Sequence, residues 1–77
     1  MPRVKLAEPE GTEEIYEELW SQYGGMLNRK QIAEYIGVKD PHTVAKFLSP
    51  VPAHEIAGRT TRYRARDVAR EIARARA

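Results

Sequence analysis

Residues 28–48 read NRKQIAEYIGVKDPHTVAKFL and hold two helix-start signals, one on each side of a glycine. Asn28 can cap a first helix with its side-chain oxygen, while Gln31 can reach back to the backbone of Asn28. Asp40 can cap a second helix, whose first residue is a proline that needs no N–H partner there. Gly37 can adopt the left-handed conformation that ends the first helix. The stretch therefore predicts a helix-turn-helix, two short helices at an angle.

The chain before these helices divides into two parts. Residues 1–11 contain two prolines and Gly11 but no apolar period, so we expect a flexible N-terminal segment. Residues 12–23 have helical spacing, with Thr12 as the expected cap, and predict an amphipathic helix. Its apolar and aromatic positions are Ile15, Tyr16, Leu19, Trp20 and Tyr23. The aromatic side chains could form a ligand platform, but in so small a domain we favour packing of Trp20 and its neighbours onto the core.

A proline-rich break separates the helix pair from a predicted β-hairpin. Residues 49–52 read SPVP, and each proline biases the residue before it away from helical conformation. Residues 53–56 and 61–64 then predict two strands joined by a turn at 58–60. The hairpin as a whole, a wing, is predicted to span 53–64.

The second strand of this wing is expected to present two different faces. Side chains alternate along a strand, so Arg62 and Arg64 point away from the side on which Tyr63 anchors the wing to the core. After the wing, residues 66–76 have apolar positions at helical spacing and predict a final amphipathic helix. Those positions are Val68, Ala69, Ile72 and Ala73. The element order predicts a mostly α fold with a small β-hairpin, a winged helix-turn-helix preceded by an N-terminal amphipathic helix.

Length and composition limit what such a chain can do. Its 77 residues predict one domain, over residues 12–77, with too small a core for an enclosed active site. The chain has no cysteine, so disulfides and thiolate zinc sites are excluded, and its apolar runs are too short to cross a bilayer. No signal-peptide pattern opens it, and we expect a soluble, cytoplasmic protein.

No set of side chains predicts catalysis or a cofactor. Ser21 and Ser49 lack a recognisable base and orienting acid, and no glycine-rich loop could hold a phosphate. His42 and His54 have no metal-ligand spacing, and we expect His54 to be structural. We therefore expect no enzymatic activity, cofactor, metal or small-molecule substrate.

Charge is divided unevenly along the chain. The formal net charge is +2, but residues 1–28 carry six glutamates against two basic residues. Residues 29–77 carry eleven lysines and arginines against five acidic residues. A basic segment that contains a predicted helix-turn-helix is the electrostatic footprint of a protein that contacts phosphates. We therefore expect double-stranded DNA as the partner, with the second helix in the major groove.

Three groups of residues are candidates for DNA contact. On the second helix, the side chains expected to reach base edges are His42, Thr43 and Lys46. On the wing, the candidates for phosphate or minor-groove contact are Arg59, Thr60, Thr61, Arg62 and Arg64. The candidates for contact with the DNA backbone near the first helix and the turn are Arg29, Lys30 and Lys39. The alternative for each group is an ordinary solvated side chain on the protein surface.

Three stretches of the chain resemble one known family. Residues 26–38 (MLNRKQIAEYIGV), 43–48 (TVAKFL) and 58–68 (GRTTRYRARDV) are similar to the excisionase-type, MerR-like winged-helix family, and the resemblance covers roughly residues 26–75. It implies that the second helix enters the major groove while the wing contacts the adjacent backbone or minor groove. It also implies a recognition role for the three second-helix candidates and a wing role for Arg59, Thr60, Arg62 and Arg64.

The family resemblance leaves the biological role open. Family members in mobile elements bend DNA, assemble on tandem sites and direct a recombinase towards excision, which implies a recombinase or self-association as further partners. Relatives act as transcription regulators or as DNA-reading parts of phage packaging proteins. An alternative of another class is a protein-interaction module that keeps the winged-helix shape without binding DNA. The turn over 38–42 is one residue longer than the usual family spacing, and the acidic helix before residue 26 lies outside the shared pattern.

Overall fold

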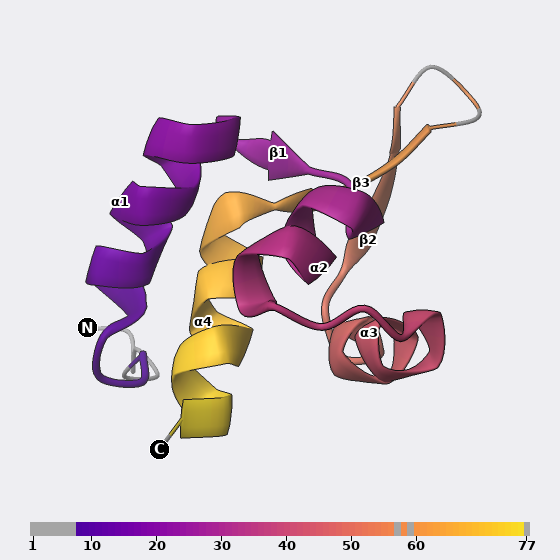
Figure 1. Ribbon diagram of the computed structural model, residues 1–77. Coiled ribbons are helices and arrows are strands. Elements are labelled where there is room, and N and C mark those ends of the chain that lie inside the picture. The colour runs from indigo at the N-terminus through magenta and orange to yellow at the C-terminus, as the bar shows by residue number, and fades with distance from the viewer. Residues whose placement is uncertain (1–7, 57, 59, 77) are drawn as a thin grey trace, which may run out of the picture.

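Helices make up most of the protein, and a small antiparallel sheet lies beside them (Figure 1). The computed structural model describes residues 8–56, 58 and 60–76. Within these ranges lie α1 (Thr12–Tyr23), β1 (Met26–Leu27), α2 (Arg29–Ile36), α3 (Pro41–Leu48), β2 (Ala53–Ile56), β3 (Thr60–Arg64) and α4 (Ala65–Arg76). The prediction of a mostly helical fold with a small β-hairpin is confirmed. None of the helices in the described ranges has the length and apolar character needed to cross a membrane.

The helix α1 has the predicted bounds, but its N-terminus is built differently. Gly11 occupies the capping position with φ of 93° and supplies no side-chain cap. Thr12, the expected cap, is instead the first helical residue and is buried, with its hydroxyl donating to the Pro9 carbonyl at 2.6 Å. Glycine takes the left-handed conformation before this helix without the steric cost that a side chain would bring. The prediction of Thr12 as the cap is therefore wrong.

The core forms where α1 packs along α4 (Figure 1). Ile15 and Leu19 of α1 are buried, as predicted. All four apolar positions predicted for α4 are buried as well. The other elements and the segments between them contribute further buried apolar residues, namely Leu27, Ile32, Val44, Leu48, Val51 and Tyr63. The helix pair and the sheet are therefore fixed to the same core as the two longer helices.

Trp20 does not join this core. Its side chain is 57% exposed, although the neighbouring Leu19 is fully buried. One residue along a helix turns the side chain by about 100°, which moves Trp20 from the buried face of α1 to its flank. There its ring lies against Gly25, and the ring centroid is 6.1 Å from that of Tyr16. The predicted packing of Trp20 onto the core is therefore wrong.

The two short helices begin and end as the sequence predicts. Asn28 Oδ1 accepts the Gln31 N–H at 2.7 Å, and Gln31 Oε1 accepts the Asn28 N–H at 2.9 Å. Gly37, with φ of 76°, ends α2. Asp40 caps α3 by accepting the His42 N–H at 3.2 Å. Each boundary is thus set by contacts within a few residues, which is why sequence alone could predict it.

The sheet has the strand order β1-β3-β2, and both strand pairs are antiparallel. The sequence does not predict β1, which places Leu27 opposite Tyr63. The hairpin β2–β3 has the predicted strands, except that β3 begins one residue earlier, at Thr60, and α4 follows it directly. The strands β2 and β3 extend away from the body of the protein (Figure 1).

The N-terminal segment that was expected to be flexible is described over residues 8–11. The Glu8 carboxylate accepts hydrogen bonds from Arg70 at 3.0 Å and from Arg66 at 3.1 Å. These contacts hold the described part of the segment against the first half of α4. Residues 1–7 lie outside the described residues.

Candidate nucleic-acid interface

The exposed face of α3 carries the predicted base-reading residues, two in its first turn and Lys46 in its last turn. His42, Thr43 and Lys46 are all exposed. Asp40 accepts the Thr43 hydroxyl at 2.9 Å, in addition to the His42 N–H. The Thr43 hydroxyl hydrogen is therefore engaged, while its oxygen lone pairs and its methyl group remain available to a partner. Sequence reasoning missed this hydrogen bond, although an aspartate cap followed three residues later by a threonine is its signal.

The strand β3 carries the predicted wing residues on alternating faces. Tyr63 is buried against the core, and its neighbours Arg62 and Arg64 point to the opposite face. Arg64 is exposed, whereas Arg62 is half-buried and its guanidinium donates to the Thr61 carbonyl at 3.2 Å. Thr60 lies on the arginine face and is half-buried. Thr61 is exposed although it shares the face of Tyr63, because the hairpin extends beyond the core.

The first turn of α2 is joined to β3. Arg29 Nε donates to the Tyr63 hydroxyl at 3.4 Å, which places a cation beside the strand. Lys30, next along α2, and Lys39, between α2 and α3, are exposed. Arg59, a further wing candidate, lies outside the described residues. The three cations expected to contact the DNA backbone therefore all remain at the surface.

The acidic face of α1 lies on a different side of the protein from α3 and the hairpin. Both α3 and the β2–β3 hairpin lie on the side away from α1 (Figure 1). The exposed glutamates of α1 are Glu13, Glu14, Glu17 and Glu18. A charge distribution of this kind attracts a polyanion to one side of a protein and repels it from the other.

The ion pairs of the described residues gather around α4. They join Arg66 to Glu8 and Glu13, Arg70 to Glu8 and Asp67, and Arg74 to Glu71. Hydrogen bonding from Arg70 lowers the pKa of Glu8, and hydrogen bonding to Glu13 raises the pKa of Arg66. The candidate cations on α2, α3 and β3 have no carboxylate partner within the part of the chain that the structure describes. They therefore remain available to phosphate oxygens.

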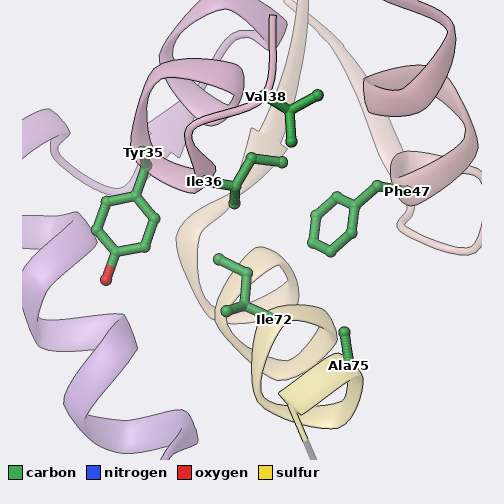
Figure 2. Close-up of a pocket in the computed structure, with 6 residues that line it drawn as sticks. All are labelled: Tyr35, Ile36, Val38, Phe47, Ile72 and Ala75. Carbon is green, nitrogen blue, oxygen red and sulfur yellow. The ribbon is translucent and has the colours of Figure 1, made fainter. Parts of the chain in front are cut away.

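An apolar hollow of about 310 Å³ lies between α2, α3 and α4 (Figure 2). Its lining residues are Tyr35, Ile36, Val38, Phe47, Ile72 and Ala75. Figure 2 shows the Tyr35 hydroxyl pointing away from the hollow, and this hydroxyl donates to Glu18 of α1. The lining has no carboxylate, imidazole or amine for acid–base chemistry, and no candidate DNA-contact residue belongs to it. Across the described ranges, no group of three His, Cys, Asp or Glu side chains could hold a metal ion.

Two large apolar side chains in the described part of the chain are exposed: Trp20, which was expected in the core, and Ile56, which the sequence did not single out. Among the described residues, the large hydrophobic side chains that are exposed are those of Trp20, at 57%, and Ile56, at 45%. The sequence feature that could have indicated the exposure of Ile56 is its position at the end of a strand, next to a turn that the small core cannot cover.

No protein-family model, no curated protein and no solved structure matches this chain.

Proposed function

We propose that this chain is a winged helix-turn-helix protein that binds double-stranded DNA, with α3 in the major groove. The hairpin β2–β3, the wing, contacts the adjacent backbone or minor groove. The order of the elements supports this reading, because the α2–α3 pair is followed directly by a projecting hairpin. An α-helix with its side chains is about 10–12 Å in diameter and the major groove is about 12 Å wide, so the groove can admit α3.

The observation that carries the proposal is the separation of charge. The exposed cations of α2, α3, β3 and the turn are Arg29, Lys30, Lys39, Lys46 and Arg64. None of them has an ion-pair partner among the described residues, and the acidic face of α1 lies on the other side of the protein. Phosphates that approach these cations release condensed counterions, which is the main source of affinity in non-specific DNA binding.

The side chains of α3 contact base edges, and those of the wing contact phosphates. His42 can donate to or accept from a base edge, and Lys46 can reach the O6 and N7 of guanine. The Thr43 methyl group can contact the methyl group of thymine. Arg62 and Arg64 can contact phosphates through their guanidinium groups, which adds affinity without reading sequence.

The biological role that we propose is that of an excisionase-like architectural factor in a mobile element. It rests on the resemblance of residues 26–75 to the excisionase-type family. Such a factor bends DNA and directs a site-specific recombinase, and further copies of the chain can bind neighbouring tandem sites. A MerR-like transcription regulator or a packaging subunit would use the same DNA-binding surface for a different partner.

The exposure of Trp20 favours a second candidate, a protein-interaction module that does not bind DNA. Its ring is held against Gly25 and Tyr16, and more than half of it faces solvent beside the glutamates of α1. Rigid exposed aromatic side chains are frequent centres of binding energy in protein interfaces. Failure of the chain to bind DNA in a salt-sensitive way would favour this candidate.

The assigned residues are tested on a duplex that the wild-type protein selects from a random-sequence library. We expect Arg62→Ala to weaken binding to all sequences and to reduce the slope of log K against log[salt] by about one. Lys46→Ala and His42→Ala should instead relax the sequence preference, at a cost of roughly 1–3 kcal/mol on the preferred site.

Arg74→Ala is the matched control for these variants. Arg74 is exposed on α4 and pairs with Glu71, outside the proposed surface. We expect wild-type affinity and salt dependence from this variant. The site assignment is wrong if the three interface variants bind as the wild type does, or if Arg74→Ala weakens binding as much as Arg62→Ala.

A further inference from the structure

Ile56 is an apolar side chain in a position that the core does not cover. It is the last residue of β2, in the hairpin that projects from the body of the protein (Figure 1). Its exposed fraction is 45%. An isolated exposed apolar residue is ordinary on a protein surface, so its meaning depends on which side chains surround it.

The strand register places Ile56 on the basic face of the hairpin. Ile56 is opposite Thr60, and His54 is opposite Arg62. Directly opposed residues share a face of an antiparallel sheet, and so do alternate residues along a strand. Ile56 therefore shares a face with Arg62, and this face is turned away from the buried Tyr63. The hairpin carries an apolar group near its end and guanidinium groups nearer the body.

This combination suits the minor groove of duplex DNA. Phosphates border the groove, where Arg62 and Arg64 can contact them, and base edges form its floor. Proteins that bind the minor groove insert apolar side chains, isoleucine among them, between base steps and kink the duplex by roughly 20–90°. A β-branched side chain has a stiff χ1 torsion, so Ile56 would hold its shape between two base pairs.

We propose that Ile56 is a wedge that enters the minor groove beside the segment read by α3, partly unstacks one base step and bends the duplex. This inference rests on the proposed DNA-binding function. Pyrimidine–purine steps unstack most easily, so the wedge selects such a step at a fixed distance from the bases that α3 contacts. Ile56 thereby sets the bend and part of the sequence preference, while the cations supply affinity.

The test measures bending and unstacking separately from binding. The full chain is added to saturation to a duplex of about 30 base pairs, selected by the wild-type protein and carrying a donor and an acceptor dye at its ends. A second set of duplexes carries 2-aminopurine in place of one adenine at each pyrimidine–purine step in turn. We expect the wild type to raise energy transfer between the ends and to raise 2-aminopurine fluorescence at one step.

The variants at position 56 decide whether the wedge produces these signals. We expect Ile56→Ala to lose both signals at saturation while keeping the wild-type salt slope, and Ile56→Leu to restore both. Arg62→Ala is the contrast, because it should weaken binding yet keep the bend once the duplex is saturated. Circular dichroism checks that each variant keeps the fold.

The outcomes separate this inference from the function on which it rests. Equal bending by Ile56→Ala and the wild type would overturn the wedge. Binding by the wild type without bending would also overturn it, together with the proposed architectural role, and would leave the proposal of DNA binding intact. Absence of duplex binding by the wild type, even at low salt, would overturn the DNA-binding proposal itself.

Discussion

Trp20 lies so close to Gly25 that a larger residue at position 25 would have to displace its ring. A Cβ atom at position 25 would lie 2.4 Å from Trp20 Cζ3. The sequence could not reveal this contact, because the aromatic stripe of α1 and its buried aliphatic stripe have the same helical period. Packing against α4 decides which of the two stripes faces the core.

The variant Gly25→Ala should displace the Trp20 ring. Trp20 is the single tryptophan of the chain, so its fluorescence reports the change directly. We expect a red-shifted emission maximum and a loss of at most about 1 kcal/mol in the free energy of unfolding, because the exposed ring can move aside for the added methyl group. In a Trp20→Ala background the same substitution should cost less, since the clash is gone. Unchanged emission together with additive costs would contradict the described contact.

The exposed residues of the candidate site could be placed from the sequence because one cap fixes where α3 begins. Once Asp40 is the cap, the helical period puts His42, Thr43 and Lys46 on the exposed face. The contact between Arg29 and Tyr63 could not be predicted in this way. It joins residues 34 positions apart and follows from the pairing of strands rather than from any local pattern.

At the level of elements, short-range signals predicted the helices and the hairpin, while long-range pairing was missed. The strand β1 has two residues, too few for a period of two to be visible, and it exists because Leu27 pairs with Tyr63 far along the chain. The position of Glu8 against α4 has the same origin. Its carboxylate accepts hydrogen bonds from arginines about sixty residues away, so no local sequence pattern predicts this contact.

The contact between Glu8 and α4 should make stability depend on pH in the acid range. Arg70 lowers the Glu8 pKa below 4.5, so this carboxylate stabilises the fold above that pH and loses its effect as the pH falls through its folded-state pKa. We expect Glu8→Gln to be less stable than the wild type near neutral pH and the difference to shrink below pH 4.5. Urea unfolding at a series of pH values measures it.

Two further variants isolate the partner of Glu8. Arg70→Ala should reproduce the altered pH dependence, because it removes the main hydrogen-bond donor to the Glu8 carboxylate. Arg74→Ala should leave the pH dependence unchanged, since Arg74 pairs with Glu71 further along α4. A constant difference between Glu8→Gln and the wild type across the acid range would show that the described contact does not stabilise the fold.

At the scale of the whole molecule, the fold places the glutamates of α1 on a different side of the protein from the candidate cations of α3 and the hairpin (Figure 1). The sequence shows that the N-terminal part is acidic and that the remainder is basic. It does not show that α1 packs on α4, away from α3 and the hairpin (Figure 1). That arrangement leaves the cations of α2, α3 and β3 without ion-pair partners among the described residues, and it is the physical basis of the proposed interface.

The most direct test of DNA binding is a fluorescence-anisotropy titration of labelled duplexes at several salt concentrations. The duplexes are tiled from the genome or mobile element that encodes the chain. We predict a site-preferring interaction in which log K falls with log[salt] at a slope of roughly −3 to −5, which corresponds to about three to six phosphates contacted. Absence of binding even at low salt would contradict the account and would leave the Trp20 face of α1 as the surface to examine for a protein partner.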